Sequence, residues 1–164
     1  MSETLTFRFD FAAGETQTIV LPLNNLVGGT ANDTVTFNGA SQQATNSPSA
    51  SMTNSSGSSA FLDVVVQMVD GYYTEIGGSS GSWSGQAQSK LRSVIASNDS
   101  STTTWGLGMN SGNPGLTSLD AGFQGCDGLT SVPSYLPVSV RNLRDCFRDA
   151  NSFNSFIGYW DTSN

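Results

Sequence analysis

Two carboxylates near the C-terminus have the spacing that places side chains on one face of a helix. Asp145 and Asp149 are four positions apart, and paired carboxylates can act as the acid and the nucleophile of glycoside hydrolysis. Arg141, Arg144 and Arg148 are interleaved with them on the same short predicted helix. A solvated face of paired charges is therefore the simpler interpretation.

Other reactive side chains are few. The sequence has no histidine, which removes the Ser-His-Asp and Cys-His nucleophile pairs and the commonest zinc sites. It also lacks the D-x-[DN]-x-[DN]-G spacing of an EF-hand calcium loop. We expect no catalytic residue, no metal site and no cofactor, and therefore a protein that is not an enzyme. A carbohydrate-active enzyme is the alternative from that class.

The chain has two cysteines, Cys126 and Cys146. We interpret both as small buried side chains. A disulfide between adjacent turns of the chain is the alternative, and synthesis in a reducing cytoplasm disfavours it.

Aromatic residues in turn-rich sequence are the positive hint of a binding site. Tyr72, Tyr73 and Trp83 lie in such sequence, where amphipathic rings commonly supply contact area to a sugar or a protein. Packing within strands is the alternative, and it is the simpler interpretation for the two tyrosines.

The C-terminal third of the chain contains an internal repeat. Segment 117–130 aligns with segment 141–154 at an offset of 24 positions, and three apolar pairs match: Leu119 with Leu143, Phe123 with Phe147, and Leu129 with Phe153. A period of about 20–29 residues is typical of leucine-rich repeats, in which each unit adds one strand and one short helical turn. We expect these six residues to form the repeat core.

The residues around this match resemble BspA-like leucine-rich repeats, a surface-protein repeat common in mycoplasma lipoproteins and marine phage proteins. Segment 129–133 is similar to its strand, segment 136–147 to its turn and short helix, and the ending Trp160-Asp-Thr-Ser-Asn164 is its most specific part. The resemblance covers residues 116–164. It implies surface display and recognition, and it brings no catalytic or metal-binding residue.

The end of the last repeat is dense in aromatic residues. We interpret Phe153, Phe156, Ile157, Tyr159 and Trp160 as its core. Each repeat buries its apolar side only against a neighbour, and nothing in the sequence covers this one. Either the natural chain is longer than the 164 residues given, or Phe156 and Trp160 contact another subunit. We expect the isolated chain to self-associate or aggregate.

Alternating apolar and polar residues predict strands in the N-terminal half. Residues 5–11 and 18–21 flank a turn and predict a hairpin, and further strands are expected over 34–39, 61–69 and 72–76. The uncharged segment 41–59 is predicted to be a long loop. The fold class is mostly β, with a β-sandwich-like or immunoglobulin-like domain over residues 1–80 followed by a short leucine-rich-repeat solenoid.

The Gly/Ser-rich segment 77–85 predicts a linker or a hairpin tip between two domains. Residues 81–115 are interpreted as this linker and an irregular capping repeat, whose apolar residues are Leu91, Val94, Ile95, Trp105 and Leu107. Residues 116–164 are assigned to the repeats.

Charge and the N-terminus limit the partners. A net charge of −7 with six basic residues argues against nucleic acid and against anionic membranes. The chain begins without a basic and apolar leader, which favours a virion protein, such as a phage fibre or decoration component, over a bacterial cell-surface adhesin fragment. We expect other virion proteins or a second copy as partners, in a homo-oligomer, and a host-surface protein or glycan as a further partner.

Overall fold

A strictly alternating strand organises the molecule. The computed structural model describes residues 4–78, 83, 87–97, 105, 107 and 115–163. In β1 (Thr4–Phe11) every second side chain is buried, beginning with Leu5 and ending with Phe11. Because successive strand residues point to opposite faces, this pattern gives the strand one apolar face and one polar face.

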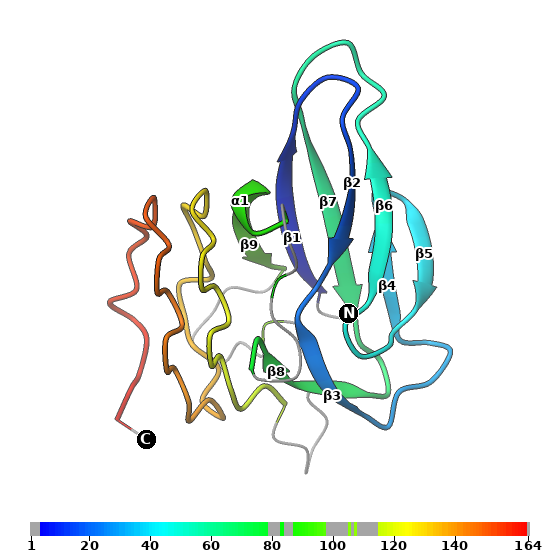
Figure 1. Cartoon of the computed structure of the whole chain (residues 1–164). Coiled ribbons are helices and arrows are strands. Elements are labelled where there is room, and N and C mark those ends of the chain that lie inside the picture. The colour runs from blue at the N-terminus through cyan, green and yellow to red at the C-terminus, as the bar shows by residue number, and fades with distance from the viewer. Residues whose placement is uncertain are drawn as a thin grey trace.

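The described chain is mostly β, as predicted, and its sheets are antiparallel. Beside β1, its elements are β2 (Thr16–Val20), β3 (Leu23–Val27), β4 (Thr34–Phe37), β5 (Ala40–Gln43), β6 (Ser49–Thr53), β7 (Ala60–Gln67), β8 (Tyr72–Ile76), α1 (Ala87–Lys90) and β9 (Leu91–Ala96) (Figure 1). Five strands form one sheet in the order β5-β4-β7-β1-β9, and two smaller sheets pair β2 with β6 and β3 with β8. Among the described residues, no helix is long or apolar enough to cross a membrane.

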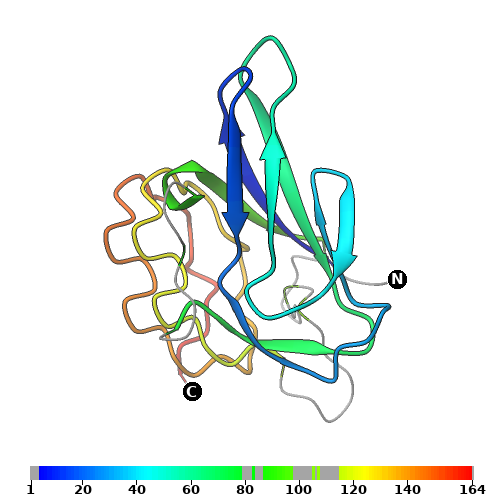
Figure 2. The ribbon, with the colours of Figure 1, turned by 45° about the vertical axis from the view of Figure 1, so that its right-hand side comes forward.

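The two-stranded β2–β6 sheet packs on the apolar face of the large sheet. Ile19 of β2 and Met52 of β6 belong to the same buried cluster as Phe7, Phe9 and Val64. Figure 2 shows β2 and β6 in front of β1 and β7. The outer face of the large sheet is polar, and the cross-strand pair Arg8–Asp63 forms an ion pair of 2.8 Å there.

The predicted hairpin of residues 5–11 and 18–21 is wrong. β1 pairs with β7 and β9, whereas β2 pairs with β6 in a different sheet. Both edges of β1 are therefore occupied, and the turn at residues 12–15 carries the chain from one layer to the other. Gly14, with φ of 70°, supplies the left-handed residue of that turn.

The predicted long loop over 41–59 is also wrong, because it contains the end of β5 and all of β6. Burial of Met52 and hydrogen bonds together order this uncharged segment. The hydroxyls of Thr18 and Ser51 pair across β2 and β6 at 3.0 Å. Buried Asn54 donates to the carbonyls of Phe11, Ala12 and Ser58, which leaves its amide satisfied.

One buried carboxylate holds two turns together. Asp33 is fully buried, and its two oxygens accept four backbone N–H groups, from Thr30, Val69, Asp70 and Gly71 at 2.6–3.0 Å. Burial favours the neutral acid, but the four amides outweigh burial and hold the pKa of Asp33 below its usual range. The turn before β8, which the sequence predicted from Asp70-Gly71, is thereby tied to the turn before β4.

Leu91, Val94 and Ile95, expected in a capping repeat, lie instead on β9, where they extend the large sheet by pairing with β1. Trp105 and Leu107 are buried. Most of the remaining capping segment lies outside the described residues.

The C-terminal segment contains no helix in its described part, residues 115–163, so the predicted short helix per repeat is wrong. Successive tight turns replace it. Ala121, Gly125, Asp145 and Asp149 all have φ between 51° and 69°, in the left-handed region, which interrupts a right-handed helix at every fourth residue. The four residues form two pairs that are 24 positions apart.

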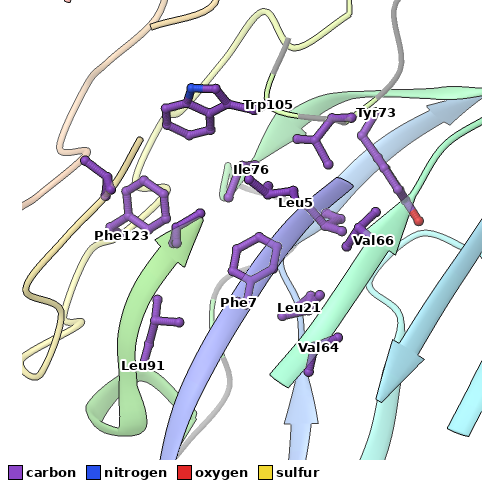
Figure 3. Close-up of a cluster of buried hydrophobic side chains, with 14 of the residues drawn as sticks. Leu5, Phe7, Leu21, Val64, Val66, Tyr73, Ile76, Leu91, Trp105 and Phe123 are labelled. Atoms are coloured by element: carbon purple, nitrogen blue, oxygen red, sulfur yellow. The ribbon is translucent and has the colours of Figure 1, made fainter. Parts of the chain in front are cut away.

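The buried residues form one continuous cluster from Leu5 to Trp160. Figure 3 shows Phe123 and Trp105 in the same buried cluster as Ile76, Phe7 and Leu91. Most of the predicted linker 77–85 lies outside the described residues, and the division into domains stays a prediction. Residues on its two sides are nevertheless joined directly, because the amide of Ile76 donates to the carbonyl of Ser118 at 3.1 Å and the amide of Thr117 donates to the carbonyl of Thr74 at 2.8 Å.

Candidate interaction surface

Two consecutive segments run side by side at the C-terminal end. We call residues 115–138 the first coil and residues 139–163 the second coil. Four amides of the first coil, those of Leu119, Ala121, Phe123 and Gly125, donate to carbonyls of the second coil located 23 positions later, at 2.7–2.8 Å. Arg141 and Ser152 donate back to Thr117 and Asp127. Figure 1 shows the two coils stacked as neighbouring layers.

The first coil is attached to the edges of two sheets. On one side, the amides of Ile76 and Gly78 donate to the carbonyls of Ser118 and Asp120. On the other side, β9 and the first coil form a parallel bridge between Ser93 and Ser131. A Cβ on Gly77 would collide with the backbone of the first coil, so the approach requires glycine there. The strands β8 and β9 therefore supply the layer on which the coils stack.

Matched positions in the two coils differ in burial. Leu119 and Phe123 are 0% exposed, whereas Leu143 and Phe147, located 24 positions later, are only partly buried. The second coil covers the first, and no described residue covers the second. A hollow of about 450 Å³ lies there, and its apolar lining includes Leu143, Phe147, Ile157 and Trp160. We call this outer side of the second coil the terminal face.

The backbone of the terminal face carries unpaired donors. The carbonyls of Asn142, Arg144, Cys146 and Arg148 point at the first coil, and in a trans peptide the next N–H points the opposite way. The amides at 143, 145, 147 and 149 therefore point outward. No described residue accepts a hydrogen bond from them. The neighbouring carbonyls of Leu143, Asp145 and Phe147 are already used within tight turns.

The two residues expected to contact another subunit, Phe156 and Trp160, differ in exposure. Phe156 is 67% exposed, as expected for a contact residue, but Trp160 is 9% exposed and packs inside the chain. Its indole donates to the carbonyl of Pro133 at 3.0 Å and its ring lies 5.8 Å from that of Trp105. The expectation that Trp160 lacks cover is therefore wrong, because residues of the first coil and Trp105 surround it.

The aromatic residues proposed to bind a partner are mostly internal. Tyr73 is 0% exposed and its hydroxyl donates to the carbonyl of Thr45, while Trp83 packs edge-on against Phe7 and Phe9. Tyr73 and Trp83 therefore serve strand packing, which was the alternative interpretation. Tyr72 is half-buried. A surface stack that the sequence did not single out joins Tyr135 and Tyr159, whose rings lie 5.1 Å apart at 11°.

The six residues of the expected repeat core are all packed in the cluster. Leu119, Phe123 and Leu129 are fully buried, and Leu143, Phe147 and Phe153 pack against them with part of their surface exposed. The rings of Phe123 and Phe147 stack at 5.6 Å and 18°. The first coil thus supplies the better covered half of this core.

The acidic pair Asp145 and Asp149 does not lie on a helix. Both residues are exposed, and their left-handed φ values remove the helix that would have placed them on one face. Arg144 instead binds Asp120 of the first coil through two hydrogen bonds of 3.0–3.1 Å, and Arg148 lies 3.5 Å from Asp149. Within the described residues, no group of three His, Cys, Asp or Glu side chains could hold a metal ion.

The two cysteines are buried free thiols, as the simpler interpretation predicted. Burial raises the pKa of Cys126, and the neighbouring Asp127 raises it further. Burial also raises the pKa of Cys146, to about 12. Since the thiolate is the reactive form, both thiols are poor nucleophiles in the folded protein.

We expect both thiols to react with an aromatic disulfide reagent at neutral pH more than about a hundredfold more slowly in the folded chain than in denaturant. The absorbance of the released thiolate measures both rates. The denatured sample should release two thiolates per chain, which calibrates the measurement. Rapid reaction of both cysteines in native buffer would show that the two coils open readily.

The outer face of the large sheet is the other exposed surface of note. Phe61 is 60% exposed there, and the Arg8 guanidinium lies 5.8 Å from the centre of its ring. The surrounding charges are already paired, Arg8 with Asp63 and Arg92 with Asp10. This face therefore offers the exposed side chains of Phe61 and Ile95 beside paired charges, whereas the terminal face combines an apolar hollow with unpaired backbone donors.

Comparison with protein-family models, with curated proteins and with solved structures finds no match to this chain. The geometry of the terminal face is therefore the basis on which a function can be proposed.

Proposed function

We propose that this chain is a non-enzymatic structural and interaction protein of a virion surface, such as a phage fibre or decoration component. The observation that carries the proposal is the terminal face, where an apolar hollow adjoins a row of unpaired amides. Such a surface is suited to a polypeptide partner, because backbone donors next to apolar pockets give affinity and specificity together. The partners are other virion proteins or a second copy, and a host-surface protein or glycan on the outward side.

The repeat resemblance supports the same proposal. We interpret the two coils as the first turns of a BspA-like leucine-rich-repeat solenoid, capped by a β-sandwich-like domain. The contacts between positions 23–25 apart are consistent with this interpretation, because a solenoid contacts only its neighbouring repeats. Repeats of this kind also occur in bacterial lipoproteins, so a cell-surface adhesin is the second candidate.

Mass spectrometry of purified particles and of cell envelopes from the source culture tests the proposal. We expect peptides of this chain to be enriched in the particle fraction together with other structural proteins. Recovery from envelopes of particle-free cells would instead support the adhesin. Release of reducing ends from a panel of polysaccharides by the purified chain would contradict both, since it would reveal a carbohydrate-active enzyme.

A further inference from the structure

We infer that the turn between β4 and β5 is a site of spontaneous covalent modification, at which the backbone nitrogen of Gly39 attacks the side-chain amide of Asn38 and converts it to a carboxylate. The inference goes beyond the proposed interaction function and does not depend on it. It rests on the sequence of the turn, on its backbone conformation and on the absence of contacts to the reacting groups.

The turn is a two-residue β-hairpin connection. Phe37 of β4 pairs with Ala40 of β5, so Asn38 and Gly39 alone connect the two strands. Their φ values are both positive, 45° and 90°, as a type I′ turn requires, and Asn-Gly is a favoured sequence for that turn. No other asparagine of the chain is followed by glycine. The turn therefore places the one Asn-Gly pair of the protein at the tip of a hairpin.

The reaction needs only these two residues and water. The Gly39 nitrogen gives up its proton to hydroxide and attacks Cγ of Asn38. A new N–Cγ bond forms, the Cγ–NH₂ bond breaks, and the leaving group takes a proton from water and departs as ammonia, which leaves a five-membered succinimide ring. Water then opens the ring without any transfer of electrons. Cleavage of the N–Cγ bond gives aspartate, and cleavage at the other carbonyl gives isoaspartate, in which the main chain passes through Cβ and Cγ.

The reacting groups are accessible in the folded chain. Asn38 and Gly39 are both exposed, and a Cβ on Gly39 would meet no described atom within 4 Å beyond its chain neighbours. Among the described residues, neither the Asn38 side chain nor the Gly39 N–H has a hydrogen-bond partner. The backbone N–H of Asn38, which does not react, donates to the carbonyl of Asp63 at 2.9 Å. Hydroxide and water therefore reach the attacking nitrogen.

Other asparagine side chains are held by the fold. Asn54 donates to three backbone carbonyls, and Asn32 donates to the carboxylate of Asp70. Asn154 is an informative exception, because it is exposed and has no hydrogen-bond partner among the described residues. It is followed by Ser155, whose Cβ shields the attacking nitrogen, whereas glycine has no Cβ. Asn154 therefore serves as an internal reference for the reaction.

Local opening of the hairpin sets the rate in the folded chain. Asn38 must leave its left-handed conformation before the Gly39 nitrogen can meet Cγ. β5 lies at the edge of its sheet and three of its four residues are exposed, so this opening breaks few contacts (Figure 1). The products then differ in their effect. Aspartate suits the same turn and adds a negative charge, whereas isoaspartate lengthens the main chain between the paired strands and should loosen β5.

Incubation of the intact chain in mildly alkaline buffer, followed by peptide mapping with mass spectrometry, tests the inference. We expect Asn38 to gain the mass difference between OH and NH₂ at least about tenfold faster than Asn154 does. The rate should rise with pH, because hydroxide removes the proton from the attacking nitrogen. Both aspartate and isoaspartate should appear at position 38, and enzymatic methylation with a labelled methyl donor counts the isoaspartate.

Asn38→Gly is the matched control, since Gly-Gly also forms a type I′ turn but has no side-chain amide. It should keep the circular dichroism spectrum of the wild type and show no mass gain at this turn. Conversion of Asn38 no faster than that of Asn154 in native buffer would overturn the inference. Rapid conversion seen only in denaturant would overturn it as well, because the folded turn would then protect its own amide. An equal mass gain in the Asn38→Gly chain would assign the reaction to a different residue.

Discussion

Replacing Asp33 with asparagine is expected to lower the free energy of unfolding by about 3–5 kcal/mol, although the two side chains have nearly the same shape. Each carboxylate oxygen accepts two backbone amides, Oδ1 from Val69 and Asp70 and Oδ2 from Thr30 and Gly71. The asparagine side chain has one oxygen and one NH₂ group. In either orientation, two backbone donors would face a donor inside a fully buried site.

Asp70→Asn is the matched control. Asp70 is exposed, and both of its side-chain partners, Thr30 and Asn32, donate to the same oxygen. An amide oxygen can take that place, so we expect a denaturation midpoint close to that of the wild type. Chemical denaturation followed by circular dichroism compares the two variants. Equal midpoints for the Asp33 and Asp70 variants would show that the four amides are not held by the Asp33 carboxylate in solution.

The same carboxylate predicts a loss of stability in acid. Its pKa in the folded chain lies below the ordinary value of about 3.9, so the folded state binds this proton less readily than the unfolded state. The contribution of Asp33 is therefore complete above about pH 4 and declines as pH falls through the folded-state pKa. Wild type should lose this contribution below about pH 4, and Asp33→Asn should lack it at every pH.

Replacing Phe123 with alanine is expected to lower the free energy of unfolding by about 3–5 kcal/mol, the range for a large buried aromatic residue. Phe123 is 0% exposed, stacks on Phe147 and contacts Trp105. Phe147→Ala, at the matching position of the second coil, should cost at least about 1 kcal/mol less, because Phe147 already keeps part of its surface in water.

Equilibrium denaturation at two protein concentrations measures the difference between these two variants. Arg144→Ala is a surface control in the same region and should cost under about 1 kcal/mol, since the Arg144 side chain is 73% exposed. If Phe147→Ala proved as costly as Phe123→Ala, and more costly at higher concentration, the terminal face would be covered by a second copy in solution.

The sequence predicted the strands that carry strict alternation but not how they pair. Alternate side chains of a strand point to one face, as Leu5, Phe7, Phe9 and Phe11 do, so β1 could be predicted from its own residues. Its partners are distant in the sequence, since β7 and β9 both follow β6, and local turn signals at 12–15 suggested the nearer β2 instead. Strand pairing depends on which strand edges are free in the assembled sheet, and the local sequence does not indicate which edges those are.

The candidate site was predictable in its spacing but not in its geometry. The offset that matches Leu119 with Leu143 and Phe123 with Phe147 also relates the hydrogen-bonded edges of the two coils. The left-handed residues Ala121 and Asp145 gave no signal, because neither residue type requires a positive φ, and the helix expected there does not form. The structural role of Asp33 was not predicted for a related reason. Its four partners are backbone amides, and the sequence does not show which amides point at a given side chain.

The attachment of the first coil to β8 and β9 has a consequence for how the stack can grow. In the central part of the first coil, the carbonyls of Ser118 and Asp120 accept from the amides of Ile76 and Gly78, while alternate amides from Leu119 to Gly125 donate to the second coil, so this part of the stack has a direction. Heterologous contacts that repeat without closing produce filaments. Because the sheets occupy the accepting side of the first coil, such a series can be extended from this chain only at the terminal face.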